Sequence, residues 1–141
     1  MPSSPIPCEG EHAELVAVTR DYLDGMFYTD ETKLRRAFHP QSLQVGHYHG
    51  RLEYDPLDPF IKFVVDGPAS KPGAPYDAEI AVLEVAFDIA VVKVVDEWRG
   101  ERYTDYLTML KEDGKWSIVN KAFTVHPPCE PGATIRPSAL S

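Results

Sequence analysis

The sequence has little cysteine and no long apolar run. Its 141 residues include two cysteines, Cys8 and Cys129, each in a proline-bearing flank. In a reducing compartment they would be unpaired thiols, and the alternative is a disulfide that joins the two ends of the chain. No stretch approaches the roughly 20 apolar residues of a membrane span, and residues 1–8 lack the charged start and apolar core of a secretory signal. We therefore expect a cytoplasmic protein with no membrane partner.

Positive charge is also scarce. The chain has 14 Lys and Arg against 22 Asp and Glu, for a formal net charge of -8. Such a charge repels phosphate backbones, and the basic residues are scattered instead of clustering on one element. Glycine-rich phosphate loops, Gly-x-Ser-x-Gly elbows and Cys-x-x-Cys pairs are missing. We expect no nucleic-acid partner, and the kinase, α/β-hydrolase, dinucleotide-binding and zinc-finger classes lose support.

Helical periodicity dominates the first half of the chain. Apolar residues recur every three or four positions over residues 11–27, which predicts one amphipathic helix. A second, short helix follows and ends at Pro40. After two short strands within residues 42–54, Asp55 is expected to cap a third helix whose first residue is Pro56. Three helices therefore precede the main run of strands.

The second half alternates between apolar and polar residues, as strands do. Two-residue turn signals separate four segments rich in Val, Ile, Phe, Tyr and Thr, which span residues 77–86, 89–98, 102–111 and 115–125. Helices followed by an antiparallel meander define an α+β domain in which the helices cover one face of the sheet. We place this single domain at residues 11–126, between an N-terminal extension, 1–10, and a proline-rich tail, 127–141.

The turns also predict which side chains face the core. With two-residue turns and no bulge, Tyr106 pairs with Lys121 in the last two strands. Alternation then places Asp96, Asp105 and Asn120 on the buried face of the sheet and Lys121 on the exposed face. Because desolvation of a buried carboxyl raises its pKa, Asp105 becomes a candidate acid or base. The alternative is a carboxylate in a salt bridge with Lys121 or Arg102.

Two stretches resemble a known family. The resemblance is carried by YLDGMFYTDETKLRRAFHP, from Tyr22 to Pro40, and by RYTDYLTMLKEDGKWSIVNKAF, from Arg102 to Phe123. Both closely resemble the Putative lumazine-binding family of the nuclear transport factor 2-like superfamily, alongside SnoaL-like polyketide cyclases and ketosteroid isomerases. The likeness implies a cone-shaped, cystatin-like fold. In it, three N-terminal helices pack on a curved antiparallel sheet around an apolar pocket for a small-molecule ligand, often in a homodimer.

Ketosteroid isomerases provide a comparison of mechanism. By resemblance, their helix-one tyrosine, which helps hold the enolate oxygen, falls on Tyr22. Their catalytic aspartate falls on Gly46, so the nearest substitute base is His47. Their second oxyanion donor falls near Asp105 or Tyr106. Because the base itself is missing, the resemblance does not support steroid-isomerase activity.

Lys121 lies on one of two faces of the sheet, depending on the register of the last strand. In the register without a bulge it lies outside, as a surface partner of Asp105 or Tyr106. Sheets of this superfamily are commonly bulged, and a bulge near Val119 would turn Lys121 and Phe123 into the pocket. There Lys121 could hold an anionic substrate or stabilise a developing oxyanion.

A metal site is a weaker alternative. His47, His49 and Glu53 form the pattern His-x-His-x-x-x-Glu, the first metal-binding motif of cupins, and imidazoles two residues apart on a strand can chelate one ion. The second cupin motif is missing, and His126 is the only later histidine. We expect no metal and no other cofactor. His39, after the second helix, is expected to anchor the chain through a backbone hydrogen bond or to line the pocket.

Aromatic side chains are numerous enough to line such a pocket. The candidate ligand contacts are Tyr28, His39, Tyr54, Trp98, Tyr103 and Phe123. The leading hypothesis is a cofactor-independent lyase, isomerase or cyclase acting on a small, largely apolar carbonyl or hydroxyl compound. Asp105 or His47 would move the proton, while Tyr22 and Lys121 would polarise the substrate oxygen. The alternative is a non-catalytic ligand-binding or dimerisation module.

Overall fold

The computed structural model describes residues 10–127, which form three helices and a six-stranded sheet. The extension before them and the tail after them, with Cys8 and Cys129, lie outside the described residues. The elements are α1 (Glu11–Tyr28), α2 (Glu31–Ala37), β1 (Phe38–Tyr48), β2 (Arg51–Pro56), α3 (Leu57–Val65), β3 (Ala78–Ala86), β4 (Ile89–Trp98), β5 (Glu101–Glu112) and β6 (Lys115–Val125).

Helices α1 and α2 form an antiparallel hairpin. Leu15, Tyr22 and Leu23 lie on the buried side of α1, at the spacing that its sequence predicts. The side chain of Asp30 caps α2 by accepting a hydrogen bond from the backbone N–H of Lys33 at 3.1 Å. No helix within residues 10–127 combines the length and the apolar character needed to cross a membrane.

The start of α3 differs from the prediction. The helix begins at Leu57, Pro56 occupies the N-cap position, and no side chain caps it. Pro56 pairs with Leu43 of β1, and its extended backbone, with ψ of 168°, is held by that pairing. Asp55 therefore stays in β2 and is not the helix cap, so its carboxyl group is available to the interior of the fold.

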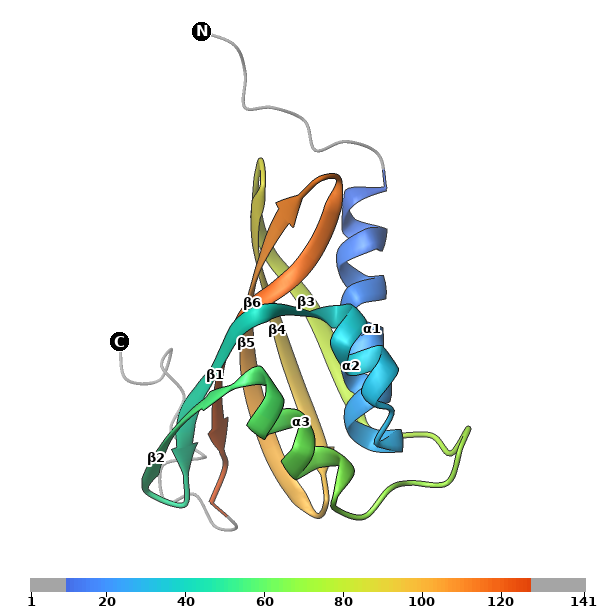
Figure 1. Ribbon diagram of the computed structural model, residues 1–141, viewed down its shortest axis with the longest axis vertical. Coiled ribbons are helices and arrows are strands. Elements are labelled where there is room, and N and C mark those ends of the chain that lie inside the picture. Colours follow the sequence, from blue (N-terminus) through green and yellow to red (C-terminus); the bar gives the residue numbers. More distant parts are fainter. Residues whose placement is uncertain (1–9, 128–141) are drawn as a thin grey trace, which may run out of the picture.

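The sheet has the strand order β2-β1-β6-β5-β4-β3. Strands β1 and β6 run parallel, and every other neighbouring pair is antiparallel. The four C-terminal strands begin and end within one residue of their predicted limits. Figure 1 shows the three helices on one side of the curved, unclosed sheet. The α+β arrangement expected from the sequence is thus confirmed.

A bulge in β6 replaces the register without a bulge and confirms the alternative of a bulge near Val119. Leu107 pairs with Lys121 and Met109 pairs with Ile118, which leaves Val119 as the extra residue. The pairing of Tyr106 with Lys121 is therefore wrong, and so is the placement of Lys121 on the exposed face. The bulge turns Lys121 inward, where only 4% of its surface is exposed, whereas Tyr106 is 45% exposed. Asn120 is displaced from the buried row and is only partly buried.

Candidate active site

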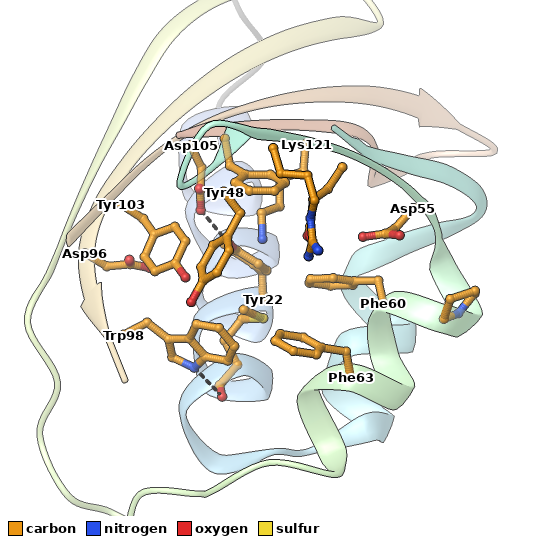
Figure 2. Close-up of a pocket in the computed structure, with 15 residues that line it drawn as sticks. Tyr22, Tyr48, Asp55, Phe60, Phe63, Asp96, Trp98, Tyr103, Asp105 and Lys121 are labelled. Atoms are coloured by element: carbon orange, nitrogen blue, oxygen red, sulfur yellow. Dashed lines mark hydrogen bonds and ion pairs between the residues drawn. The ribbon is translucent and has the colours of Figure 1, made fainter. Parts of the chain in front are cut away.

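A cavity of about 340 Å³ lies between α1, α3 and the inner face of the sheet. Its walls are largely aromatic, and Figure 2 shows rings from the helices facing rings from the strands. The rings that the structure brings together here are Tyr22, Tyr48, Phe60, Phe63, Trp98, Tyr103 and Phe123. A volume of this size is within the range of small-molecule sites, which are also mostly apolar.

Tyr22 and Asp105 form the polar centre of the cavity. The Tyr22 hydroxyl donates a hydrogen bond to Oδ2 of Asp105 at 2.5 Å, and both residues are buried. Burial raises the pKa of Asp105, against the opposing effects of Lys121 and of this hydrogen bond. Burial and the nearby Asp105 also raise the pKa of Tyr22. Oδ1 of Asp105 is buried and has no hydrogen-bond partner among residues 10–127.

Asp96 adds a second buried carboxyl group. It lies on β4, in the same inward-facing row as Val92 and Val94, and its Oδ1 likewise has no hydrogen-bond partner within the described part of the chain. Burial, and after it the charge of Asp105, raises the pKa of Asp96 to about 7. The cavity therefore holds a carboxyl group whose protonation changes near neutral pH.

Lys121 supplies the cation of the cavity. Its Nζ lies 4.5 Å from the ring centroid of Phe60, 5.1 Å from that of Phe123 and 5.3 Å from that of Tyr22. Burial lowers the pKa of Lys121, although Asp105 and the other nearby carboxyl groups oppose this effect. Burial therefore makes the amine easier to deprotonate than in water, and a neutral amine is a nucleophile.

Three of the predicted ligand contacts line the cavity: Trp98, Tyr103 and Phe123. The indole N–H of Trp98 donates to the backbone carbonyl of Met26 at 3.0 Å, which joins β4 to α1. The rings of Trp98 and Tyr103 meet edge to face, with centroids 6.0 Å apart. These contacts fix one aromatic wall before any ligand binds.

Four other predicted site residues do not line this cavity. His47 is exposed because β1 turns alternate residues inward, and Gln44 and Gly46 occupy the buried positions. Tyr28 donates a hydrogen bond to the carbonyl of Ala74, and Tyr54 is 63% exposed.

His39 is the fourth predicted site residue that does not line the cavity. Its Nδ1 accepts a hydrogen bond from the backbone N–H of Gln41 at 3.0 Å. The ring thus makes the local backbone contact expected for a residue that anchors the chain after α2. It faces a separate surface groove near Glu112.

The weaker metal alternative also lacks the required geometry. Nε2 of His49 lies 2.6 Å from Oε2 of Glu101, whereas Glu53 accepts a hydrogen bond from Arg51 at 2.8 Å. Together with the outward-facing His47, these side chains do not converge. No group of three His, Cys, Asp or Glu side chains within residues 10–127 is arranged to hold a metal ion.

Gly46 lies on β1 at a position that has no space for a carboxylate side chain. A Cβ atom at Gly46 would lie 2.1 Å from the carbonyl oxygen of Phe123 on the parallel strand β6. There is no room for a side chain. The carboxyl groups of the cavity come instead from Glu53, Asp55, Asp96 and Asp105. Figure 2 shows Asp55 and Asp96 on opposite sides of the cavity.

Two of these carboxyl groups were missing from the predicted site. Strand alternation already places Asp96 in a buried row, so a signal for it exists in the sequence. Asp55 resembles a helix cap in the sequence, and only its pairing across to β1 shows otherwise. Phe60 belongs to the apolar stripe of α3, which predicts burial without indicating a cavity.

The fold and the cavity together define the class of protein. Three helices that close one side of a curled sheet over an aromatic pocket are the arrangement of nuclear transport factor 2-like proteins. The sequence model of the family described as Putative lumazine-binding matches residues 10–124. This chain belongs to that family.

Similar proteins agree with this assignment. An NTF2-like protein of unknown function from Silicibacter pomeroyi DSS-3 has a TM-score of 0.78 and 31% identity, over 86% of this chain and 100% of that one. Another, from Shewanella baltica OS155, has a TM-score of 0.74 and 25% identity, over 87% and 99%. Aldolase FrzH of Cladobotryum sp is 28% identical over 119 residues, 83% of this chain and 93% of that protein.

Proposed function

We propose that this protein is a cofactor-independent enzyme that transfers a proton at the carbon next to a carbonyl group, in an aldol-type or isomerase reaction. One observation carries the proposal: Asp105 has one oxygen held by Tyr22 while the other lies unpartnered in an aromatic cavity. A carboxylate in an apolar site is a stronger base than in water, because desolvation raises its pKa. The similarity to an aldolase supports the same class of reaction.

In this proposal Asp105 abstracts the proton and later returns it. Tyr22 orients the carboxyl group through its hydrogen bond and keeps Oδ1 directed at the substrate. Lys121 lies on the same inner face and polarises the substrate oxygen on which negative charge develops. His47 was the other candidate base, but its exposed position leaves Asp105 as the group that we assign.

The substrate that fits this description is small and largely apolar. The cavity volume of about 340 Å³ suits a compact molecule, and its rings favour apolar surface. Four carboxyl groups line the cavity against two cations, Arg51 and Lys121, so a neutral carbonyl compound fits better than a polyanion.

Proton exchange with solvent tests the proposal without knowledge of the natural substrate. Cyclohexanone is incubated with the protein in D2O, and deuterium at its α-carbon is followed by NMR. We expect catalysed exchange that the Asp105→Asn variant reduces about 100-fold or more, as loss of a general base does. Asp88→Asn, at an exposed turn, is the matched control and should exchange like the wild type. Equal rates in Asp105→Asn and wild type would overturn the role of Asp105, and saturable binding without exchange would favour the non-catalytic binding module.

We also propose that the protein forms a homodimer through the outer face of its sheet. Ile89 and Leu110 pair across β4 and β5, and each is 41% exposed on the face away from the helices. Tyr106 adds an aromatic ring to the same face. Sedimentation should show a dimer that Leu110→Lys converts to a monomer, because a buried charge opposes association. A monomeric wild type would contradict the proposal.

A further inference from the structure

Lys121 differs from other lysines of the fold in its surroundings. Lys33, Lys62 and Lys111 each lie within 3.1 Å of a carboxylate oxygen. Lys121 is 4% exposed and makes no hydrogen bond or ion pair with any residue between 10 and 127. Its amine lies against three aromatic rings, so an ammonium form would be poorly hydrated and would have no hydrogen-bond acceptor among the described residues.

The amine of Lys121 lies between aromatic rings and the cavity. Phe60, Phe123 and Tyr22 each have a ring centroid within 5.3 Å of Nζ. The remaining side is the cavity, whose wall includes Lys121 itself. An amine that is desolvated by apolar walls and open on one side has the environment of a nucleophilic lysine.

We propose that Lys121 forms an imine with the carbonyl carbon of an aldehyde or ketone bound in the cavity. The proposal rests on the proposed function for its carbonyl substrate. It adds a covalent step in which Lys121 bonds to the substrate and does more than polarise its oxygen.

The step balances with the groups present. The lone pair of neutral Nζ forms the C–N bond, and the π electrons of the C=O bond move to oxygen. One proton leaves nitrogen and one reaches oxygen, which gives a carbinolamine. A carboxyl group then protonates the hydroxyl, the C–O bond breaks, and water leaves an iminium ion bonded to Lys121. Asp96 or Asp105, both buried in the cavity wall, can donate that proton.

The iminium ion then acts as an electron sink. Oδ1 of Asp105 takes a proton from the neighbouring carbon to give an enamine, or takes it from a β-hydroxyl group as the carbon–carbon bond breaks. Hydrolysis reverses the first stage and returns the amine. No oxidant, reductant or metal is needed. The two residues that this step requires, Lys121 as the amine and Asp105 as the carboxyl group, lie on the neighbouring strands β6 and β5 and both line the cavity.

Reductive trapping tests the imine directly. The full-length protein is incubated with cyclohexanone and sodium cyanoborohydride at pH 7, and the labelled residue is found by peptide mass spectrometry. We expect Lys121 to carry about tenfold or more of the label found on any exposed lysine, since the neutral fraction of an amine rises about tenfold for each unit by which its pKa falls. Label spread over exposed lysines with Lys121 unmodified would overturn the proposal.

Two variants test whether the label depends on the amine of Lys121. Lys121→Arg retains a cation but cannot form an imine with a ketone under these conditions, so the specific label should disappear. Lys115→Arg removes an exposed lysine from the same strand and should leave the label on Lys121 unchanged. If Lys121→Arg fails to fold, the pH dependence of labelling in the wild-type protein tests the imine instead. Labelling of Lys121 that persists at pH 6 supports the imine, whereas labelling that follows the exposed lysines overturns it.

The two proposals can fail separately. If Asp105→Asn abolishes α-proton exchange and Lys121 is never trapped, the proposed function stands and the imine falls. If Lys121 is trapped but the wild type exchanges no α-protons, the imine stands and the proposed proton transfer falls.

Discussion

The hydroxyl of Tyr22 on α1 donates a hydrogen bond to Oδ2 of Asp105 on β5, 83 residues later in the chain, at 2.5 Å. This bond joins the helical layer to the sheet inside the cavity. It also makes the two carboxyl oxygens unequal, because Oδ2 is held and Oδ1 is unpartnered within the described residues. Tyr22 is therefore placed to decide which oxygen meets a substrate.

Replacing Tyr22 by Phe should weaken both stability and proton transfer. The variant leaves a second buried carboxyl oxygen of Asp105 without a partner, at a cost of about 1–3 kcal/mol in the free energy of unfolding. Because the hydrogen bond lowers the pKa of Asp105, that pKa should rise further when the bond is lost. Urea unfolding and the pH profile of cyclohexanone exchange measure the two effects.

Tyr106→Phe is the matched control for this substitution. Tyr106 lies next to Asp105 on β5 but points to the outer face, where it is 45% exposed. Loss of the Tyr106 hydroxyl should change neither the free energy of unfolding nor the rate of cyclohexanone exchange. Identical behaviour of the two variants would contradict the role given to the Tyr22 hydroxyl.

Asp96 should make the protein less stable as the pH rises. Its pKa is about 7 in the folded protein, above the ordinary value of 3.8, so the folded state binds a proton more tightly than the unfolded chain. The stability from this group is full below about pH 4 and is lost as the pH rises through 7. Asp96→Asn should therefore raise the free energy of unfolding at pH 8 by on the order of 2 kcal/mol, with little effect at pH 4.

Denaturant unfolding of Asp96→Asn at several pH values checks this prediction. Asp88→Asn, at an exposed turn, provides the comparison and should show no such pH-dependent gain. A difference between wild type and Asp96→Asn that stays constant from pH 4 to pH 8 would show that Asp96 does not titrate in this window.

Local sequence signals predicted most of the meander. The turns Arg99-Gly100 and Asp113-Gly114 adopt positive φ at both positions, as two-residue hairpins require, and they set the limits of three strands. Alternation from those turns correctly buried Asp105. These features depend on neighbouring residues and can be inferred from one segment at a time.

The rest of the site depends on contacts between distant segments. Lys121 faces inward only because Val119 is the extra residue of a bulge, and alternation alone cannot locate a bulge. Asp55 stays in a strand because its neighbour Pro56 pairs with Leu43. His47 faces solvent because the long parallel pairing of β1 with β6 fixes which side of β1 is buried.

Gly46→Ala should disturb the wall of the cavity. The added Cβ would lie 2.1 Å from the carbonyl oxygen of Phe123, so β1 and β6 would have to separate locally. We expect a loss of about 1–3 kcal/mol in the free energy of unfolding, as for other overpacked positions. Gly67→Ala is the comparison, because its nearest neighbour is a side chain, and the loss there should be limited to the hydrogen bonds that the Arg99 guanidinium donates to backbone carbonyls. Equal losses in the two variants would argue against a tight contact between β1 and β6.

Glu11, the first residue of α1, should make the stability of the protein depend on pH in the direction opposite to Asp96. Oε1 of Glu11 accepts hydrogen bonds from Trp116 Nε1 at 2.6 Å and from Lys111 Nζ at 3.1 Å, which ties the start of α1 to the sheet. These two contacts, that with Trp116 foremost, lower the pKa of Glu11. The resulting stability is present above the ordinary glutamate value of 4.5 and is lost as the pH falls below it.

Glu11→Gln should therefore lower the unfolding midpoint at pH 7 and have little effect near pH 3, where the wild-type carboxyl is itself becoming protonated. Glu14→Gln is the matched control, since it removes a charge from the same first turn at an exposed position. Thermal unfolding of the three proteins from pH 3 to pH 8 distinguishes the specific contact from the general effect of charge at a helix N-terminus. Equal losses in both variants would assign the stabilisation to that general charge effect, whereas a loss confined to Glu11→Gln would assign it to the contacts with Trp116 and Lys111.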